Sequence, residues 1–516
     1  MRKLPIGIQT FSEIIEEQHT YVDKTGMAVD LVENGKYYFL SRPRRFGKSL
    51  LVSTLQALFE GREELFKGLA AHDRWDWSVQ YPVIKISFSG VARTVADMKQ
   101  DIENILRDNE ERLELECRDI SDIGGCFKEL IKKSFQKYDR RVVILVDEYD
   151  KLILDNLDQV EIAKKAREIL KDLYTTIKDS DEFIKFAFLT GVSKFAKVSI
   201  FSGLNNLEDI TLNSQYATIC GYTQNDLECV FAEYLQGADM EKVQEWYNGY
   251  NFLGESVYNP FDILLFIRNS FQFNAYWFAT GTPTFLIKLI QQNNFFIPVL
   301  ESLKVQNTLI DSFDIENIQL EPILFQAGYL TIREVIPTGA ITMFVLSFPN
   351  LETRYSFNDF ILGYLTGQTS EKANFQSEIY AALSTGNIKL FEKTLTALFA
   401  SIPYNNYVNN TIAGYEGYFA SVIYAYLASL GLDITGEDVT NRGRIDLTVK
   451  LGENIYILEF KVDGKGKALE QIKEKDYQQK YLGEDKKIYL IGIDFSSTEK
   501  NISRFEWEQI KPHGTQ

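Results

Sequence analysis

The sequence predicts an α/β protein with an open parallel sheet, then a mainly helical section, then a second α/β domain. Strand and helix patterns alternate through the N-terminal third, and short strands return near the C-terminus. The length of 516 residues exceeds one ordinary domain, so we expect two or three. A composition of 45% hydrophobic and 25% charged residues is that of a globular protein.

The N-terminal third has the rhythm of strands joined by helices. Val142–Val146 is an unbroken run of apolar, mostly β-branched residues, which suits a strand buried on both faces of a parallel sheet. This rhythm implies helices on both sheet faces. We expect strands at Lys36–Ser41, Pro82–Phe88, Val142–Val146 and Ile184–Leu189, and helices at Ser49–Phe59, Met98–Leu115, Gly125–Tyr138 and Gln159–Lys178.

Residues 222–365 are rich in aromatics and are expected to be mainly helical. The aromatics of residues 246–278 either pack the core and lid or form a platform on which nucleic-acid bases stack. A helix at Leu320–Tyr329, followed by strands at Leu330–Val335 and Ala340–Ser347, predicts a winged-helix-like lid. The small, polar stretch Thr366–Asn374 is expected to be a linker. The predicted domains are therefore 1–221, 222–365 and 375–516, with the linker at 366–374.

After residue 374 the sequence predicts helices and then a second sheet. Strands are expected near 432–438, 443–450 and 454–460, a helix over about 467–482, and a last strand at Lys487–Ile493.

Cysteine and histidine usage excludes several kinds of site. The four cysteines form no Cys-x-x-Cys pair, so we expect reduced, mostly buried thiols and no zinc cage. The three histidines are scattered, which argues against histidine metal sites and Ser-His-Asp triads. Hydrolytic chemistry must then come from carboxylates, lysines and bound metal. The cysteines are Cys117, Cys126, Cys220 and Cys229.

The charge is −17 in total but is unevenly distributed. From residue 366 onward, 17 Lys and Arg stand against 20 Asp and Glu, which leaves −3 there and −14 in the first 365 residues. A nucleic-acid surface therefore fits the C-terminal part better. The chain shows neither an apolar run of bilayer length nor a secretory signal at its start, so we expect a cytoplasmic protein without a membrane partner.

Arg42–Ser49 (RPRRFGKS) follows one expected strand and opens a helix, as a phosphate-binding loop requires. Its amides would surround phosphate, Lys48 would reach the β- and γ-phosphates, and Ser49 would ligate Mg²⁺. The usual first glycine is replaced by Arg42. The expected ATP-binding residues in the loop are Arg44, Arg45, Phe46, Gly47, Lys48 and Ser49. Arg44 and Arg45 either add charge against the triphosphate or face a partner subunit.

Acidic residues end the expected strand at Val142–Val146. Asp147 would hold Mg²⁺ through water, and Glu148 would polarise the attacking water, because carboxyl ends of parallel strands bind ligands in open sheets. The alternative is an exposed acidic turn. Thr190 ends the next strand and either senses the γ-phosphate or is a plain strand-end threonine.

Over nearly its whole length, the chain resembles the bacterial AAA-ATPase-like family, which is often fused to a PD-(D/E)XK nuclease-like domain. The resemblance implies a P-loop NTPase sheet that binds ATP, and makes Arg42 a family trait. It rests on YVDKT (21–25), YFLSRPRRFGKS (38–49), VDEYD (146–150), LTGVSK (189–194), WYNGY (246–250) and YNP (258–260).

A second group of carboxylates lies near the C-terminus. Glu459 and Lys461 are two apart on one expected strand and share a face. Asp446 lies on the strand before it, and a hairpin would bring it close to Glu459. Two carboxylates and the Phe460 carbonyl can bind Mg²⁺, and Lys461 could activate the attacking water. Glu416 lies on the apolar face of a helix at Tyr415–Leu430, either as a further metal ligand or at a helix start that reaches solvent or caps an N–H.

Asp446, Glu459, Phe460 and Lys461 resemble the metal-binding set of the PD-(D/E)XK nucleases, whose fold is restriction-endonuclease-like. Gln471 on the next helix also resembles that superfamily and is expected to hold substrate or the lysine. Lysines follow the motif and either track a phosphate backbone or form an ordinary solvated face. They are Lys461, Lys465, Lys467, Lys473, Lys475 and Lys480.

Two functions therefore stay open. The first is an enzyme that binds Mg-ATP and cuts nucleic acid with Mg²⁺. The second is an ATP-driven signalling or scaffold protein whose nuclease-like domain binds without cleaving. Either could act as a homo-oligomer.

Overall fold

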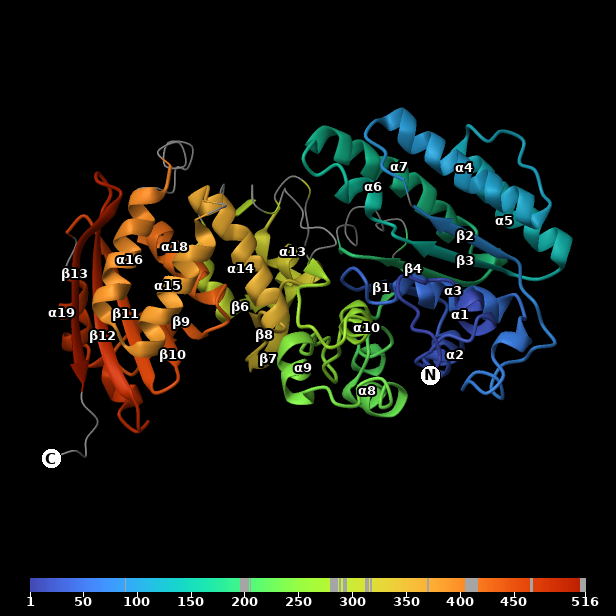
Figure 1. Ribbon diagram of the computed structural model, residues 1–516. Helices are drawn as coiled ribbons and strands as arrows, with labels where there is room; N and C mark the ends of the chain where they lie inside the picture. The colour runs from blue at the N-terminus through green and yellow to red at the C-terminus, as the bar shows by residue number, and fades with distance from the viewer. Residues whose placement is uncertain are drawn as a thin grey trace. The chain divides into compact units, whose positions relative to one another are not determined.

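The computed structural model describes residues 1–88, 90–194, 204, 206–278, 286, 289–290, 295–310, 315, 318–368, 371–403, 416–464 and 467–510 (Figure 1). The chain divides into two compact units. The first comprises Met1–Trp277 and Val305–Phe344, and the second Phe278–Lys304 and Val345–Gln516. The chain passes between them at three points: after Trp277, within β6 (Leu303–Gln306) and within β8 (Ile341–Ser347).

The first unit contains the predicted parallel sheet, in the strand order β2-β3-β4-β1-β5. The neighbouring strands in this order pair in parallel, so their carboxyl ends share one edge of the sheet. Its elements to this point are α1 (Phe11–Glu16), α2 (Thr25–Asn34), β1 (Tyr37–Ser41), α3 (Lys48–Phe59), β2 (Val83–Ser87), α4 (Val95–Leu113), α5 (Ile123–Tyr138), β3 (Val142–Asp147), α6 (Lys151–Leu154), α7 (Val160–Asp179), β4 (Ile184–Gly191) and β5 (Glu208–Asp209).

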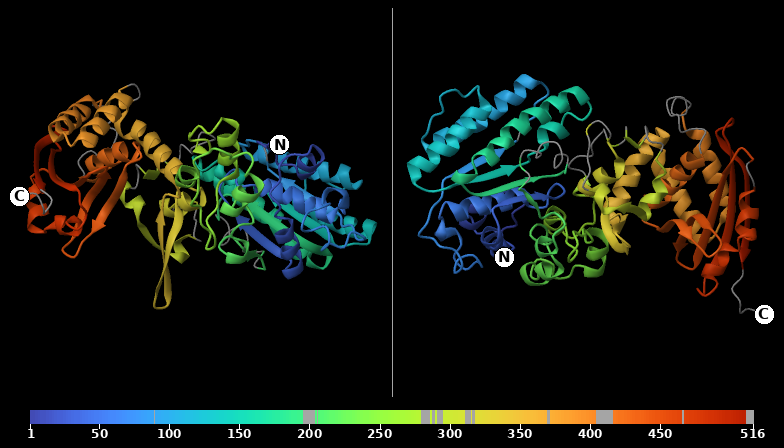
Figure 2. Two further views of the ribbon diagram at one scale, coloured as in Figure 1. Left: turned by 60° about the horizontal axis from the view of Figure 1, so that its bottom comes forward. Right: turned by 180° about the vertical axis from the view of Figure 1, so that it is seen from behind.

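Helices cover both faces of this sheet, as the sequence predicts. Helices α4, α5 and α7 lie over one face, and α1 and α3 lie over the other (Figures 1 and 2). Every residue of β3 is buried, which its apolar run requires. The predicted strands and helices of this third are all present, with ends that differ by a few residues.

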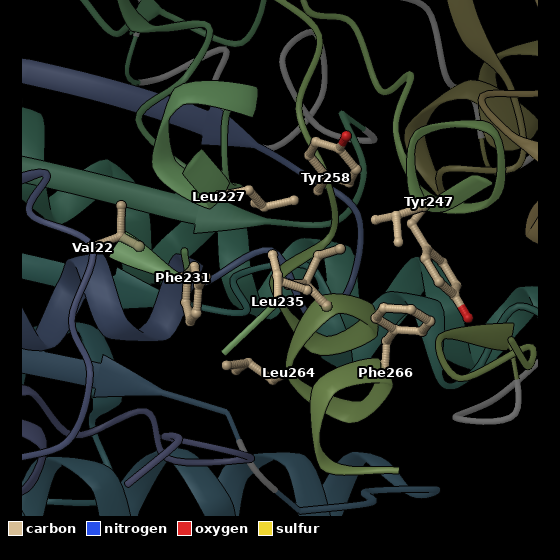
Figure 3. Close-up of a cluster of buried hydrophobic side chains, with 10 residues drawn as sticks. Val22, Leu227, Phe231, Leu235, Tyr247, Tyr258, Leu264 and Phe266 are labelled. Atoms are coloured by element: carbon tan, nitrogen blue, oxygen red, sulfur yellow. The ribbon is translucent and has the colours of Figure 1, made fainter. Parts of the chain in front are cut away.

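The rest of the first unit is mainly helical, with α8 (Gln224–Val230), α9 (Met240–Tyr247), α10 (Pro260–Arg268), α12 (Asn307–Ile310) and α13 (Leu320–Gln326), followed by β7 (Thr331–Thr338) and the start of β8. Its aromatics pack a core in which Tyr247, Tyr258 and Phe266 are buried together (Figure 3). Core packing, the first of the two alternatives, is thus the role of these three rings. The helix and two strands of the winged-helix-like lid are also present.

The second unit is built on a mixed sheet in the order β13-β12-β11-β10-β9. Only the β11–β12 pair is parallel, and the other pairs are antiparallel. Its elements are α14 (Leu351–Thr366), α15 (Lys372–Thr385), α16 (Ile388–Ser401), α18 (Glu416–Ala428), β9 (Asp433–Val439), β10 (Arg444–Leu451), β11 (Asn454–Val462), α19 (Ala468–Glu474), a 3₁₀ turn at Tyr477–Tyr481, β12 (Lys487–Ser496) and β13 (Asn501–Ile510).

Two features of this sheet differ from the prediction. The edge strand β13 was not expected, because its half-exposed residues carry no apolar run. The helix expected over 467–482 is divided at Asp476, whose φ is 47°, so α19 ends early and a 3₁₀ turn follows.

The linker at 366–374 stays a prediction, but one of its residues makes contacts within the second unit. Gln368 lies between α14 and α15 inside the second unit, and it is buried. Its side-chain amide donates to Ser401 Oγ at 2.6 Å and accepts from the Tyr426 hydroxyl at 2.7 Å. Gly367 and Glu371 of the same stretch are exposed, whereas the Gln368 amide is satisfied by neighbouring helices. The boundary at residue 221 stays a prediction.

The expectation of reduced, mostly buried thiols is also wrong for two cysteines. Cys117, in the segment after α4, forms a disulfide with Cys126 of α5, with Cα atoms 5.2 Å apart. Cys220 is a buried free thiol, and Cys229 is free but exposed. Sequence spacing could not show the pair, because the turn between the two helices brings the cysteines together. Within the described residues, no helix is both long and apolar enough to cross a membrane.

Candidate active sites

The loop between β1 and α3 presents a row of unbonded amides. Gly47 precedes α3 with a left-handed φ of 92°, and a Cβ there would meet no atom within 4 Å. Arg45 is also left-handed, with φ 67°. Across the described chain, the N–H groups of residues 44–49 donate to no protein acceptor. Such a row, leading into a helix N-terminus, is the arrangement that binds phosphate.

Two carbonyls of this loop, by contrast, bond to the Lys48 side chain. The Lys48 ammonium donates to the carbonyls of Arg42 and Pro43, each at 3.0 Å. Lys48 is only 7% exposed, and burial lowers its pKa, whereas the charge of Asp147 raises it. The interaction with Asp147 brings the loop lysine and the end of β3 into one site.

Arg42, which replaces the usual first glycine, points away from any ligand. Its guanidinium is fully buried and donates to the carbonyls of Thr211 at 2.8 Å and Tyr216 at 3.2 Å. It also lies over the Phe252 ring, 3.8 Å from the centroid. Burial lowers its pKa to about 10. Arg42 therefore anchors the start of the loop.

The acids after β3 lie at the same sheet edge as the loop. Strand β4 separates β1 from β3, so the two strand ends are about 10 Å apart. Asp147 is buried, and its Oδ1 accepts the Glu148 N–H at 3.0 Å. Glu148 has φ 53°, which is uncommon for a non-glycine residue and typical of functional turns. Burial, followed by the charge of Asp147, raises the pKa of Glu148, which suits a proton acceptor.

The side chains of Thr190 and Asp150 both bond to other parts of the protein. The Thr190 hydroxyl is fully buried and donates to the Leu40 carbonyl at 2.8 Å. This bond joins β4 to β1 and favours the strand-end alternative, while a γ-phosphate role for Thr190 stays a prediction. The Asp150 carboxylate accepts from the Ser193 N–H at 2.6 Å, and its pKa is raised by burial.

The remaining loop residues divide between backbone and surface roles. Phe46 is buried against the rings of Tyr250 and Phe252, so only its amide can serve a ligand. Arg44 and Arg45 are exposed. Ser49 is half-buried at the start of α3, where the magnesium role stays a prediction.

The second group of predicted residues meets across β10 and β11. The β10–β11 register pairs Leu447 with Leu458, and Asp446 and Glu459 are the next residues on the two strands. Asp446 Oδ2 accepts the Phe460 N–H at 2.7 Å. The Lys461 ammonium donates to Glu459 Oε1 at 3.2 Å and to the Phe460 carbonyl at 2.9 Å. The acid–lysine set expected from the strand pattern is thus assembled on one face of the sheet.

Glu459 has the burial and the unbonded carboxylate oxygen expected of a metal ligand. It is 1% exposed, and its Oε2 is buried without a hydrogen-bond partner among the described residues. Burial and the charge of Asp446 raise its pKa to about 8. An unpaired carboxylate oxygen is costly to bury. A divalent cation between Asp446 and Glu459 would remove that cost, so the residues fit Mg²⁺.

Gln471 on α19 holds Glu459, which refines the expected role. Its side-chain amide donates to Glu459 Oε1. This contact needs α19 close to β12, and Gly492 allows it, because a Cβ there would lie 2.2 Å from the Leu469 nitrogen. Gln471 therefore orients the carboxylate.

Two further residues near the site, one carboxylic acid and one phenol, were not predicted from the sequence. Asp494 on β12 lies in register with Lys461, and burial raises its pKa. Burial likewise raises the pKa of Tyr477, whose hydroxyl interacts with Gln471. Only the strand pairing reveals Asp494, and only the packing reveals Tyr477. The Glu416 side chain lies outside the described residues, so its role stays a prediction.

Replacing Glu459 is expected to stabilise the metal-free protein. The folded-state pKa is about 8 and the unfolded one about 4.5, so the native chain holds a proton that the unfolded chain loses over this pH range. Stability should therefore fall as pH rises from 5 to 8. Glu459→Gln mimics the protonated form, and should raise the free energy of unfolding at pH 8 by on the order of 2 kcal/mol. Chemical denaturation in a chelator at pH 5 and 8 measures this, with Glu453→Gln as an exposed control. An equal effect at both pH values would contradict the prediction.

Comparison with known proteins agrees with the two predicted domain types. The family described as Predicted AAA-ATPase matches residues 5–201, and the PD-(D/E)XK nuclease superfamily matches residues 414–505. The chain is 47% identical over 514 residues to a protein of Azotobacter chroococcum mcd 1 described as "Uncharacterized protein in vnfD 5'region", with 99% of each chain covered. No solved structure matches the chain. The chain therefore belongs to the AAA-ATPase-like family and carries a C-terminal domain of the PD-(D/E)XK nuclease superfamily.

Proposed function

We propose that the first unit binds and hydrolyses Mg-ATP at the carboxyl edge of its parallel sheet. The observation that carries this is the row of unbonded amides at residues 44–49 beside the buried Lys48. Amides and an ammonium supply the charge that a triphosphate needs. Mg²⁺ would be held by Ser49 and, through water, by Asp147, and it would neutralise charge on the phosphates.

Glu148 is proposed to accept the proton of the attacking water. In the Glu148→Gln variant, the loop and Lys48 are unchanged, so ATP should still bind within about threefold of the wild-type affinity. Turnover should fall by about 10²–10⁴-fold, the usual contribution of a general base. Equilibrium binding of a fluorescent ATP analogue and phosphate release measure the two effects. Wild-type turnover in this variant would remove the assigned role, and Glu64→Gln, on an exposed turn, is the control.

The second unit is proposed to cleave phosphodiester bonds at Asp446, Glu459 and Lys461. Asp446, Glu459 and the Phe460 carbonyl would hold Mg²⁺, which would stabilise charge on the scissile phosphate. Glu459 supports this most directly, through its buried and unpaired Oε2. The Lys461 ammonium would then orient the water, because it already lies beside Glu459. The expected substrate is nucleic acid.

The second candidate is an ATP-driven signalling or scaffold protein whose nuclease-like domain binds without cleaving, and the surface lysines do not distinguish it from the first. Lys467 pairs with Glu470, Lys473 with Glu508, and Lys480 with Asp438. Charges that are neutralised in this way attract a phosphate backbone less. The pairs favour the solvated-face alternative for these three lysines.

A second copy of this chain is the other proposed partner. Arg44 and Arg45 are exposed beside the loop. They fit either the triphosphate of their own subunit or the site of a neighbour. Mass measurement in solution with and without ATP distinguishes these, since only the second requires ATP-dependent association. The cytoplasmic location stays a prediction.

A further inference from the structure

The carbonyl of Arg44 is held by two side chains from distant segments. The Trp277 indole N–H donates to it at 3.2 Å, and the Asn259 side-chain amide donates at 3.4 Å. Both residues are buried. A carbonyl oxygen that turned toward a bound phosphate would repel it, so two donors on this oxygen favour the conformation in which the following amides are presented.

The two donors are themselves fixed in place. Asn259 Oδ1 accepts the Phe261 N–H at 2.9 Å and so caps α10. The preceding Tyr258 is buried in the core cluster of the helical section (Figure 3). The Trp277 ring packs against Tyr329, with centroids 5.5 Å apart. Neither donor can leave the Arg44 carbonyl without disturbing this packing.

Two further residues of the loop, Pro43 and Phe46, contact distant segments of the first unit. The Phe46 carbonyl accepts the Gly221 N–H at 3.2 Å. Gly328 packs closely against the Pro43 ring. A side chain at position 328 would place its Cβ only 2.8 Å from the Pro43 Cβ. Like Asn259 and Trp277, Gly221 and Gly328 lie beyond residue 201, where the ATPase family match ends.

We propose that Asn259 and Trp277 are positioning residues of the ATP site, and that through them the helical section senses whether the phosphate loop is occupied. This inference rests on the proposed ATP binding. It gives a role to the YNP motif at 258–260, whose asparagine caps α10 with one side-chain atom and holds the loop with the other.

The test uses the full chain and a fluorescent ATP analogue with Mg²⁺. Trp277→Phe keeps a ring but removes the N–H donor, and Asn259→Ser keeps a helix cap but removes the amide donor. Each should weaken binding about threefold to tenfold, the effect of one lost hydrogen bond. Trp246→Phe is the matched control, because Trp246 packs on Tyr247 and Phe273 and makes no bond to the loop. It should bind as the wild type does.

Tryptophan emission supplies a readout that a merely structural role would not move. ATP should change the emission of the wild type and of Trp246→Phe, but not that of Trp277→Phe. Wild-type affinity in both Trp277→Phe and Asn259→Ser, with binding still dependent on Lys48, would overturn this inference alone. Absence of ATP binding to the wild type would refute the proposed function and this inference with it.

Discussion

Lys48→Ala is expected to lower ATP affinity by about 10²-fold or more and to remove turnover. The ammonium is buried beside the loop amides, and in the free protein it bonds to the carbonyls of Arg42 and Pro43. A triphosphate would exchange these neutral partners for charged ones, and charge-assisted bonds are about twice as strong. Burial, which lowers the pKa of Lys48, also makes its charge more effective toward phosphate. Equilibrium binding of a fluorescent ATP analogue measures the loss.

Two comparisons make this result specific. Lys67→Ala removes an exposed lysine and should bind ATP as the wild type does. Thermal unfolding without nucleotide checks that Lys48→Ala still folds, which we expect because the lost bonds lie within one loop. If the Lys48→Ala variant folds and keeps wild-type affinity, the loop is not the phosphate site.

Asp446→Ala and Lys461→Ala are each expected to reduce Mg²⁺-dependent cleavage of nucleic acid by at least about 10²-fold. Asp446 shares the metal with Glu459, and its loss would leave one carboxylate where two neutralise the cation. Lys461 would orient the attacking water, a role worth about 10²–10⁴-fold. Cleavage of labelled single- and double-stranded DNA and RNA measures both effects and also identifies the substrate.

The controls separate chemistry from folding. Lys475→Ala changes an exposed lysine of the same unit and should cleave normally. Asp446→Asn keeps an oxygen that can accept the Phe460 N–H, so the local strand geometry should survive while the charge is lost. Equal cleavage by the wild type and all these variants would end the nuclease proposal. Binding of nucleic acid without cleavage by the wild type would support the second candidate.

Local sequence patterns determined which strands and which strand faces carry the residues of both sites. The apolar run at Val142–Val146 fixed a buried strand, and the acids that follow it had to lie at its carboxyl end. The spacing of Glu459 and Lys461 placed both on one strand face. These features follow from backbone periodicity and chain order, which depend on neighbours in sequence. The phosphate loop and the acid–lysine set could therefore be named before any packing was known.

Contacts between distant segments decided the rest. Arg42 stands in the loop motif, yet its guanidinium bonds to carbonyls about 170 residues away, which no local pattern encodes. Thr190 ends its strand as expected, but the neighbouring strand takes its hydroxyl. Asp494 joins the second site only through the pairing of β11 and β12. Periodicity specifies which face a side chain occupies, whereas its partner is set by strand order and helix packing, and these exist only in the folded chain.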